Sequence, residues 1–262
     1  MDARFCDELD HGFSWIVDEP ATRASHALTA GGRVWLVDPT AWEPALERAR
    51  AAGRPAAVLQ LLDRHNRDCA ALARRLGVPH LVAPARVPDG PFQVVEIRRS
   101  RRWQEVALWW PETRTLVVAE ALGTNRFFSP DGSAGVHLLL RLRPPRAALA
   151  GLEPRHLLVG HGAGIHGEAA TAALREALAR SRTDLPRALL QLPRWHSTPA
   201  GGGDAESATT GRGPAQRAAR ANPGRTRRGG AFSPASATGG LTGSASGSAP
   251  KDARRRSSGT GS

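Results

Sequence analysis

Short apolar runs that end at proline or glycine alternate with stretches of helical pattern over residues 1–196. The runs GFSWIVDEP and RVWLVDP have the turn residues AGG between them, and they predict a β-hairpin. A helical pattern follows over 44–52, and the apolar run AAVLQLL predicts a buried strand over 56–62. A chain of this kind has to pair its strands in sheets and cover them with helices.

The centre of the chain predicts one βαβ unit followed by antiparallel strands. The strand 56–62, a helix over 69–76 that Gly77 ends, and the strand HLVAP (80–84) make the βαβ unit. The runs FQVVEI, EVALWW and TLVVAEAL predict strands, and PETR predicts a turn between the last two. The strand HLLVG and a helix over 168–179 follow. This order predicts two sheets with helices outside them, rather than a doubly wound parallel sheet.

The composition changes after Trp195. The segment 197–262 holds 10 Lys and Arg against 3 Asp and Glu, and it has almost no branched or aromatic residues. Such a segment cannot bury enough apolar surface to fold, so we expect a domain over 1–196 and a disordered basic Gly/Ser/Arg-rich tail over 197–262. Two interpretations of the tail stay open: nucleic-acid association through its arginines, or solvation without a specific partner.

Three classes of protein do not fit the sequence. No run of about eighteen apolar residues predicts a membrane-spanning helix. The N-terminal segment MDARFCDELDHG is acidic where a secretion signal is basic and then apolar. Two cysteines, Cys6 and Cys69, cannot build a disulfide framework. We therefore expect a cytoplasmic protein.

Polar residues gather directly after two of the predicted strands. The strand 56–62 leads into Asp63-Arg64-His65-Asn66-Arg67-Asp68-Cys69 at the start of a helix. The ends of strands and the N-termini of helices are where α/β proteins place metal and anion sites. A second polar cluster follows the strand HLLVG, where His161 lies between two glycines that allow a close approach of the backbone. We expect the functional site at these two strand ends.

These segments resemble the metallo-β-lactamase superfamily. The family signature is a strand followed by His-x-His-x-Asp-His and a helix, then a histidine in a turn, an aspartate after a strand, and a terminal Gly-His-Gly. The segments DRHNRDCAALARRLGVPHLVAP, SRRWQEVALWWPETRTLVVAEAL and LEPRHLLVGHG are similar to these motifs in the same order, over about 12–179. The resemblance implies an α/β (α+β) fold, a metallo-β-lactamase-like αββα four-layer sandwich over 1–196.

The resemblance also implies that the first of the family's two metal sites is lost. The three histidine positions of that site hold Arg64, Asn66 and Arg101 here. A guanidinium group cannot ligate a cation, and two of them repel one.

At the second metal site, the resemblance implies that four residues can still serve as metal ligands. Asp68 keeps the aspartate, Cys69 replaces a histidine, Glu120 stands for the bridging aspartate, and His161 keeps the terminal histidine. Asp, Cys and His are competent zinc ligands, so one zinc ion is an option that the sequence leaves open.

Two functions follow from this pattern. The one we favour from the sequence is an eroded two-metal centre without a cofactor, which binds an anionic small molecule in the former active-site cleft. The expected ligand-binding residues are Arg64, Asn66, Arg101 and His166. The alternative is a mononuclear zinc hydrolase of an ester, thioester or phosphoester, with Asp68 and Glu120 as the catalytic residues.

Other polar residues have simpler interpretations. His65 lies one residue out of the ligand register, so we expect it to point away from the site. We expect His26 at the surface or in a turn, and Ser25 and Ser100 have no arranged base for a serine hydrolase. The run 98–102 (RRSRR) is either a solvated loop or a clamp for phosphate or carboxylate, since Arg suits bidentate recognition of anions.

Overall fold

A computed structural model describes residues 2–18, 21–129 and 131–186, and these residues contain two large sheets. The first sheet is formed by β1 (Ala3–Leu9), β2 (Gly12–Val17), β3 (Arg23–Ala30), β4 (Arg33–Val37), β5 (Arg54–Gln60) and β6 (His80–Val82), in this order. The second has the order β13-β12-β9-β8-β7, formed by β7 (Gln93–Ser100), β8 (Trp103–Trp110), β9 (Thr115–Val118), β12 (His156–Val159) and β13 (Ile165–His166). A short antiparallel pair, β10 (Leu122–Gly123) and β11 (Gly135–Val136), lies apart from both.

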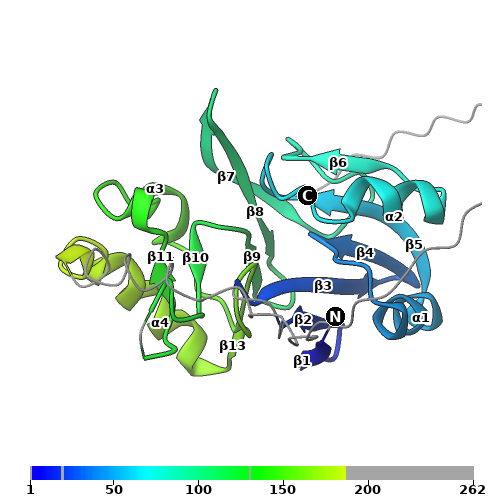
Figure 1. The fold of residues 1–262 in the computed structure, drawn as a ribbon, viewed down its shortest axis with the longest axis horizontal. Coiled ribbons are helices and arrows are strands. Elements are labelled where there is room, and N and C mark those ends of the chain that lie inside the picture. The colour runs from blue at the N-terminus through cyan, green and yellow to red at the C-terminus, as the bar shows by residue number, and fades with distance from the viewer. Residues whose placement is uncertain (1, 19–20, 130, 187–262) are drawn as a thin grey trace, which may run out of the picture. The chain divides into compact units, whose positions relative to one another are not determined.

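Helices cover the outer faces of the two sheets, as Figure 1 shows. The helices are α1 (Glu43–Ala52), α2 (Cys69–Leu76), α3 (Arg146–Leu149) and α4 (Glu168–Arg180), with a 3₁₀ turn η1 (Leu138–Leu140). α1 and α2 pack on β4, β5 and β6, whereas α4 packs on β12 and β13. In the described part of the chain, no helix is both long and apolar enough to cross a membrane.

Two apolar clusters fill the spaces between these layers. The larger one holds residues of both sheets and of α4, such as Trp35, Leu108 and Leu174. The smaller one lies between the first sheet and its helices and includes Trp15 and Leu46. The predicted mixed α+β fold, with helices outside two sheets, is therefore confirmed. The predicted tail over 197–262 lies outside the described residues.

Most predicted elements are present, but the prediction of an opening hairpin between the runs 12–20 and 33–39 is wrong. The helix 69–76 has the predicted bounds, and β5 and β6 pair in parallel around it. The residues AGG join β3 to β4, and β3 therefore lies between the two runs that were expected to pair directly. The sequence of β3, RASHALTA, contains small and polar residues and no apolar run, although most of it is buried. Its strand signal was therefore weak.

His26 lies in β3 with 1% of its surface exposed, which corrects the expected surface or turn position. Its Nδ1 atom is 2.8 Å from Ser14 Oγ. Burial lowers the pKa of His26 to about 4, although the charge of Asp7 opposes this shift. The folded protein therefore holds this ring neutral at pH values where the unfolded chain already binds a proton.

We expect acid to destabilise the protein through His26. As the pH falls from 7 to 4, the unfolded chain gains a proton that the folded chain does not bind, so the free energy of unfolding should drop by about 3 kcal/mol from this residue. Urea unfolding of the parent and of His26→Gln, both with a chelator, measures this contribution. The stability difference between parent and variant should shrink by this amount between pH 7 and pH 4. A difference that does not change with pH would contradict the assignment.

Candidate functional site

Three potential metal ligands meet at the ends of strands from both sheets. His65 follows β5, Glu120 follows β9 and His161 follows β12. One ligand atom of each residue lies within 4.8 Å of the ligand atoms of the other two. We refer to His65, Glu120 and His161 as the central cluster. Among the described residues, this is the group of three His, Cys, Asp or Glu side chains whose geometry can hold a metal ion.

One carboxylate oxygen of Glu120 is the focus of the cluster. Its Oε2 atom lies 2.7 Å from His65 Nε2 and 3.1 Å from His161 Nε2. Burial alone would raise the pKa of Glu120, but hydrogen bonds and charge from His161 and His65 outweigh burial and hold this pKa well below its usual range. Glu120 is therefore ionised at neutral pH and acts as an acceptor only.

The opposite edges of both imidazole rings are bound to acceptors. His161 Nδ1 is 2.8 Å from the carbonyl oxygen of Ala21, and His65 Nδ1 is 3.1 Å from Asp38 Oδ2. A carbonyl oxygen only accepts, so His161 Nδ1 must carry the proton. Burial would raise the pKa of Asp38, but the charge and hydrogen bond of His65 lower it, so this carboxylate also accepts. Each ring, when neutral, therefore turns the lone pair of Nε2 toward Glu120.

Two nitrogen lone pairs and one carboxylate oxygen thus converge on a single point. These groups repel one another unless a cation lies between them. The cation is either a metal ion or protons on the imidazoles. Burial lowers the pKa of His65, but the Asp38 charge and the hydrogen bonds that His65 donates to Asp38 and Glu120 outweigh it, so the net shift is upward. The geometry therefore favours a positive charge at this point.

His137 follows β11 and also contacts Glu120. Its neutral ring carries the proton on Nε2, whereas neutral His65 and His161 carry it on Nδ1. The Nδ1 atom of His137 accepts a hydrogen bond from the Leu139 amide at 3.3 Å. The proton of the neutral ring is then on Nε2, which lies 3.3 Å from Glu120 Oε1. Burial lowers the pKa of His137, more strongly than the Glu120 charge raises it. His137 is thus a neutral ring whose Nε2 lies close to the second oxygen of Glu120.

A buried carboxylate positions the backbone at Glu120. Glu105 has no exposed surface, and its Oε1 atom accepts hydrogen bonds of 2.8 Å from the amides of Glu120 and Ala121. Its Oε2 atom accepts another from Trp103 Nε1 at 2.8 Å. Burial raises the pKa of Glu105, while these hydrogen bonds oppose the shift. The segment after β9 is therefore held rigidly from the core.

A partly buried guanidinium joins the two sheets beside the cluster. Arg67 donates to the carbonyl oxygens of Ala24, Asp38 and Gly160, the last two at 2.8 and 2.9 Å. Arg67 and Asp38 both have a positive φ, 34° and 44°, which non-glycine residues adopt only at some cost. Residues in such conformations often occur at functional sites.

Of the four predicted metal ligands, the structure brings together only Glu120 and His161. Asp68 Oδ2 accepts a hydrogen bond of 2.7 Å from the Ala41 amide. Cys69 is buried in the smaller apolar cluster, where its Sγ atom lies 3.7 Å from the His65 carbonyl oxygen. Burial raises the pKa of the Cys69 thiol, which keeps it protonated. Asp68 and Cys69 therefore lie outside the central cluster.

The four predicted ligand-binding residues are also dispersed. The Arg64 guanidinium lies over the Trp103 ring, 4.3 Å from its centroid. Asn66 is exposed, and Arg101 is exposed in the turn between β7 and β8. His166 is 3.1 Å from Asp7 Oδ1 and 3.1 Å from His156 Nδ1, so it belongs to a different group of side chains.

Sequence reasoning missed two of the histidines around Glu120. His65 was expected to point away from the site, and this expectation is wrong because the loop turns at this residue, with the His65 amide bonded to the Leu62 carbonyl at 2.9 Å. A signal for His65 was present in the polar run after β5. His137 had no such signal, because it follows a strand of only two residues.

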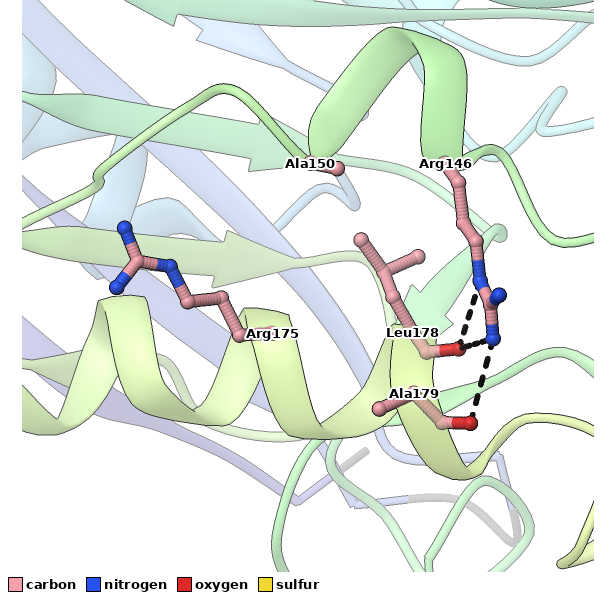
Figure 2. A pocket seen from close by; sticks show the side chains of 5 residues that line it. All are labelled: Arg146, Ala150, Arg175, Leu178 and Ala179. Atoms are coloured by element: carbon pink, nitrogen blue, oxygen red, sulfur yellow. Dashed lines mark hydrogen bonds between the residues drawn. The ribbon is translucent and has the colours of Figure 1, made fainter.

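The structure also contains a cavity that the residues of the central cluster do not line. It measures about 320 Å³ and is lined by Arg146, Ala150, Arg175, Leu178 and Ala179. Figure 2 shows Arg146 bonded to carbonyl oxygens at the end of α4. Arg175 pairs with Glu153 at 2.6 Å. Both arginines are thus engaged, and no member of the central cluster lines this cavity.

Comparisons with known proteins found similar solved structures. No protein-family model and no curated protein matches the sequence. A crystal structure of the DIM-1 metallo-β-lactamase is 15% identical, with a TM-score of 0.48 over 70% of this chain and 98% of that chain. A structure of TMB-1 is 12% identical, with a TM-score of 0.45 over 71% of this chain and 98% of that chain. The solved structures to which this chain is similar are metallo-β-lactamases, the family that its motifs resemble.

Proposed function

We propose that this protein is a metal-dependent hydrolase of the metallo-β-lactamase superfamily with a single metal ion. The ion would be held by His65 Nε2, Glu120 Oε2 and His161 Nε2. The observation that carries this proposal is the convergence of two imidazole lone pairs and one ionised carboxylate oxygen on a common point. One divalent cation satisfies all three groups at once.

The surroundings of the cluster fit a metal site. Metal-bound histidines usually donate their second N–H to a carboxylate or a carbonyl oxygen. His65 does so to Asp38, and His161 does so to Ala21. Imidazole and carboxylate suit Zn²⁺ and other divalent transition metals, and three protein ligands leave room for substrate or water. Such an ion supplies a Lewis acid that polarises the substrate and acidifies water.

The family signature also fits the chain one residue earlier, from Asp63 instead of Arg64. If it begins at Asp63, His65 takes the second histidine position and Arg67 takes the aspartate position. The Arg67 guanidinium then brings a fixed positive charge to the place where a second cation would need a carboxylate. This placement supports one ion per chain.

The proposed reaction is hydrolysis of an ester, thioester or phosphoester. The oxygen of water bonds to the acyl carbon or to phosphorus, the bond to the leaving oxygen or sulfur breaks, and the leaving group takes a proton. Glu120 stays ionised throughout, and His137 Nε2 lies 3.3 Å from its second oxygen. The buried Glu105 fixes the backbone of Glu120, and His65 and His161 contact its carboxylate, which preorganises the site.

The competing proposal is a pocket without metal, in which protons on His65 and His161 neutralise Glu120. The hydrogen-bond distances of 2.7 and 3.1 Å fit such a pair as well. In that case the centre is eroded and binds a ligand without hydrolysis. The number of metal ions per chain separates the two proposals.

Elemental analysis of protein purified without a chelator or a metal-affinity resin tests the proposal. We expect nearly one divalent transition-metal ion per chain in the parent, because three ligands and their partners are in place. The double variant His65→Ala/His161→Ala should lose this ion. The control His156→Gln/His166→Gln removes two histidines outside the cluster and should keep it. A folded parent without metal, also after dialysis against Zn²⁺, would leave only the pocket without metal.

We also propose a reducing compartment such as the cytoplasm. Cys6 and Cys69 are both free thiols. Burial raises the pKa of each, so neither is poised to form a disulfide.

A further inference from the structure

Two further histidines lie together where β1 of the first sheet contacts β13 of the second, outside the central cluster. His156 in β12 and His166 in β13 are directly opposite each other in an antiparallel pair of strands. Their ring centroids are 5.3 Å apart, close to the 5.5 Å that separates the rings of His65 and His161 in the central cluster. We refer to His156 and His166 as the histidine pair.

A buried carboxylate orients one ring of the pair. The side chain of Asp7 in β1 is 2% exposed, and its Oδ1 atom lies 3.1 Å from His166 Nε2. The Gly164 amide also donates to Oδ1, at 2.9 Å, and the Cys6 thiol donates to Oδ2 at 3.3 Å. Burial would raise the pKa of Asp7, but the hydrogen bond from His166 and the charge of His26 outweigh it. Asp7 is therefore an ionised acceptor, and His166 Nε2 must carry the proton.

The other nitrogen of neutral His166, which has the lone pair, faces His156. The two Nδ1 atoms are 3.1 Å apart. Two nitrogens bound to one ion at 2.0–2.1 Å in a tetrahedral site lie about 3.3 Å apart, so the pair already has nearly the spacing of two metal ligands. Burial and then the charges of His166 and Arg155 lower the pKa of His156, and the neutral imidazole is the form that binds a metal. His166 is exposed and His156 is partly exposed, so an ion can reach the pair from solvent.

We propose that the histidine pair binds a divalent transition-metal ion through both Nδ1 atoms, with Asp7 as the outer partner of His166. A carboxylate that accepts the second N–H of the ring is a usual partner of a metal-bound histidine. Imidazole suits Zn²⁺, Cu²⁺ and Ni²⁺, and water completes the coordination. Two imidazoles hold an ion more weakly than the three ligands of the central cluster, so this site fills only when metal is added. The inference does not rest on the proposed function, because the two sites share no ligand.

An ion at this place would connect parts of both sheets. It would cross-link β12 to β13, and Asp7 connects the same ring to β1. β13 has only two residues and leads directly through Gly167 into α4. Because the ion binds the folded chain, added metal should raise the midpoint of thermal unfolding. The proposed role of this site is therefore structural.

Calorimetric titration of the full-length chain with Zn²⁺ tests the site. In the background His65→Ala/His161→Ala, which removes two ligands of the central cluster, we expect one ion per chain. Adding His166→Gln should weaken its binding at least about 10-fold, since loss of even an outer partner costs that much. The control His80→Gln removes a partly buried histidine that contacts Gln60, and its affinity should stay within about twofold of the background.

Nitrogen-15 NMR of the histidine rings in the parent gives a readout that does not depend on the folding of a variant. Added Zn²⁺ should shift the Nδ1 resonances of His156 and His166 and leave the proton on His166 Nε2. Equal losses of affinity in His166→Gln and His80→Gln would overturn the inference. So would Nδ1 resonances of the pair that stay unchanged throughout the titration, because the 3.1 Å contact is then a hydrogen bond between the rings. Neither result depends on whether the central cluster holds metal.

Discussion

Replacing Arg67 with methionine is expected to lower the free energy of unfolding by about 3 to 5 kcal/mol. The guanidinium donates to Ala24, Asp38 and Gly160, which belong to three distant parts of the chain. Methionine keeps most of the volume but donates no hydrogen bond. The carbonyl oxygens then lose a partner in a buried place, and the carboxylates of Asp38 and Glu120 lose a compensating charge.

Urea unfolding at pH 7 with a chelator measures this effect without a contribution from bound metal. The matched control is Arg64→Met, because Arg64 is about half exposed and rests on one aromatic ring. Its loss should stay near 1 kcal/mol, as for an exposed cation–π pair. Equal, small losses in both variants would mean that Arg67 does not hold the two sheets together.

The substitution Glu120→Gln is expected to weaken metal binding by more than about 100-fold. Loss of an outer partner of a metal ligand already costs 10- to 100-fold in affinity, and Glu120 supplies a ligand atom and the negative charge of the site. The fold should persist, because the amide N–H₂ of glutamine can donate to the His65 and His161 lone pairs that otherwise need a cation.

Competition with a chromophoric zinc chelator gives the affinity, and circular dichroism checks the fold. The control Glu112→Gln changes an exposed glutamate in the turn after β8 and should bind metal like the parent. If Glu120→Gln binds metal within about 10-fold of the parent, Glu120 is not a ligand and the ion must be held elsewhere.

Local signals in the sequence were sufficient for much of the fold. The helix 69–76 combines a polar start, an apolar stripe and Gly77 in the left-handed conformation at its end. The strands β5, β8 and β9 are apolar runs bounded by turn residues. β3 was missed because its small and polar residues give no apolar run.

The candidate site was only partly accessible to sequence reasoning. Glu120 and His161 were identified because the resemblance to the family places them at the bridging aspartate and at the terminal histidine. The polar run after β5 offered seven successive residues, and the choice of Asp68 and Cys69 as ligands rather than His65 does not match the central cluster. A shift of one residue in such a loop reverses which side chains point inward.

The sequence by itself determined that a strand end rich in polar residues would meet Glu120 and His161 in a fold of two sheets covered by helices. Only the tertiary structure decided which side chain of that strand end joins them. The direction of His65 depends on the turn at Leu62 and on its bond to Asp38, which is 27 residues away in the chain. Likewise, the protonated nitrogen of each histidine depends on distant partners, Asp38 and Ala21. Such contacts follow from packing of the whole chain, and no local pattern of residues encodes them.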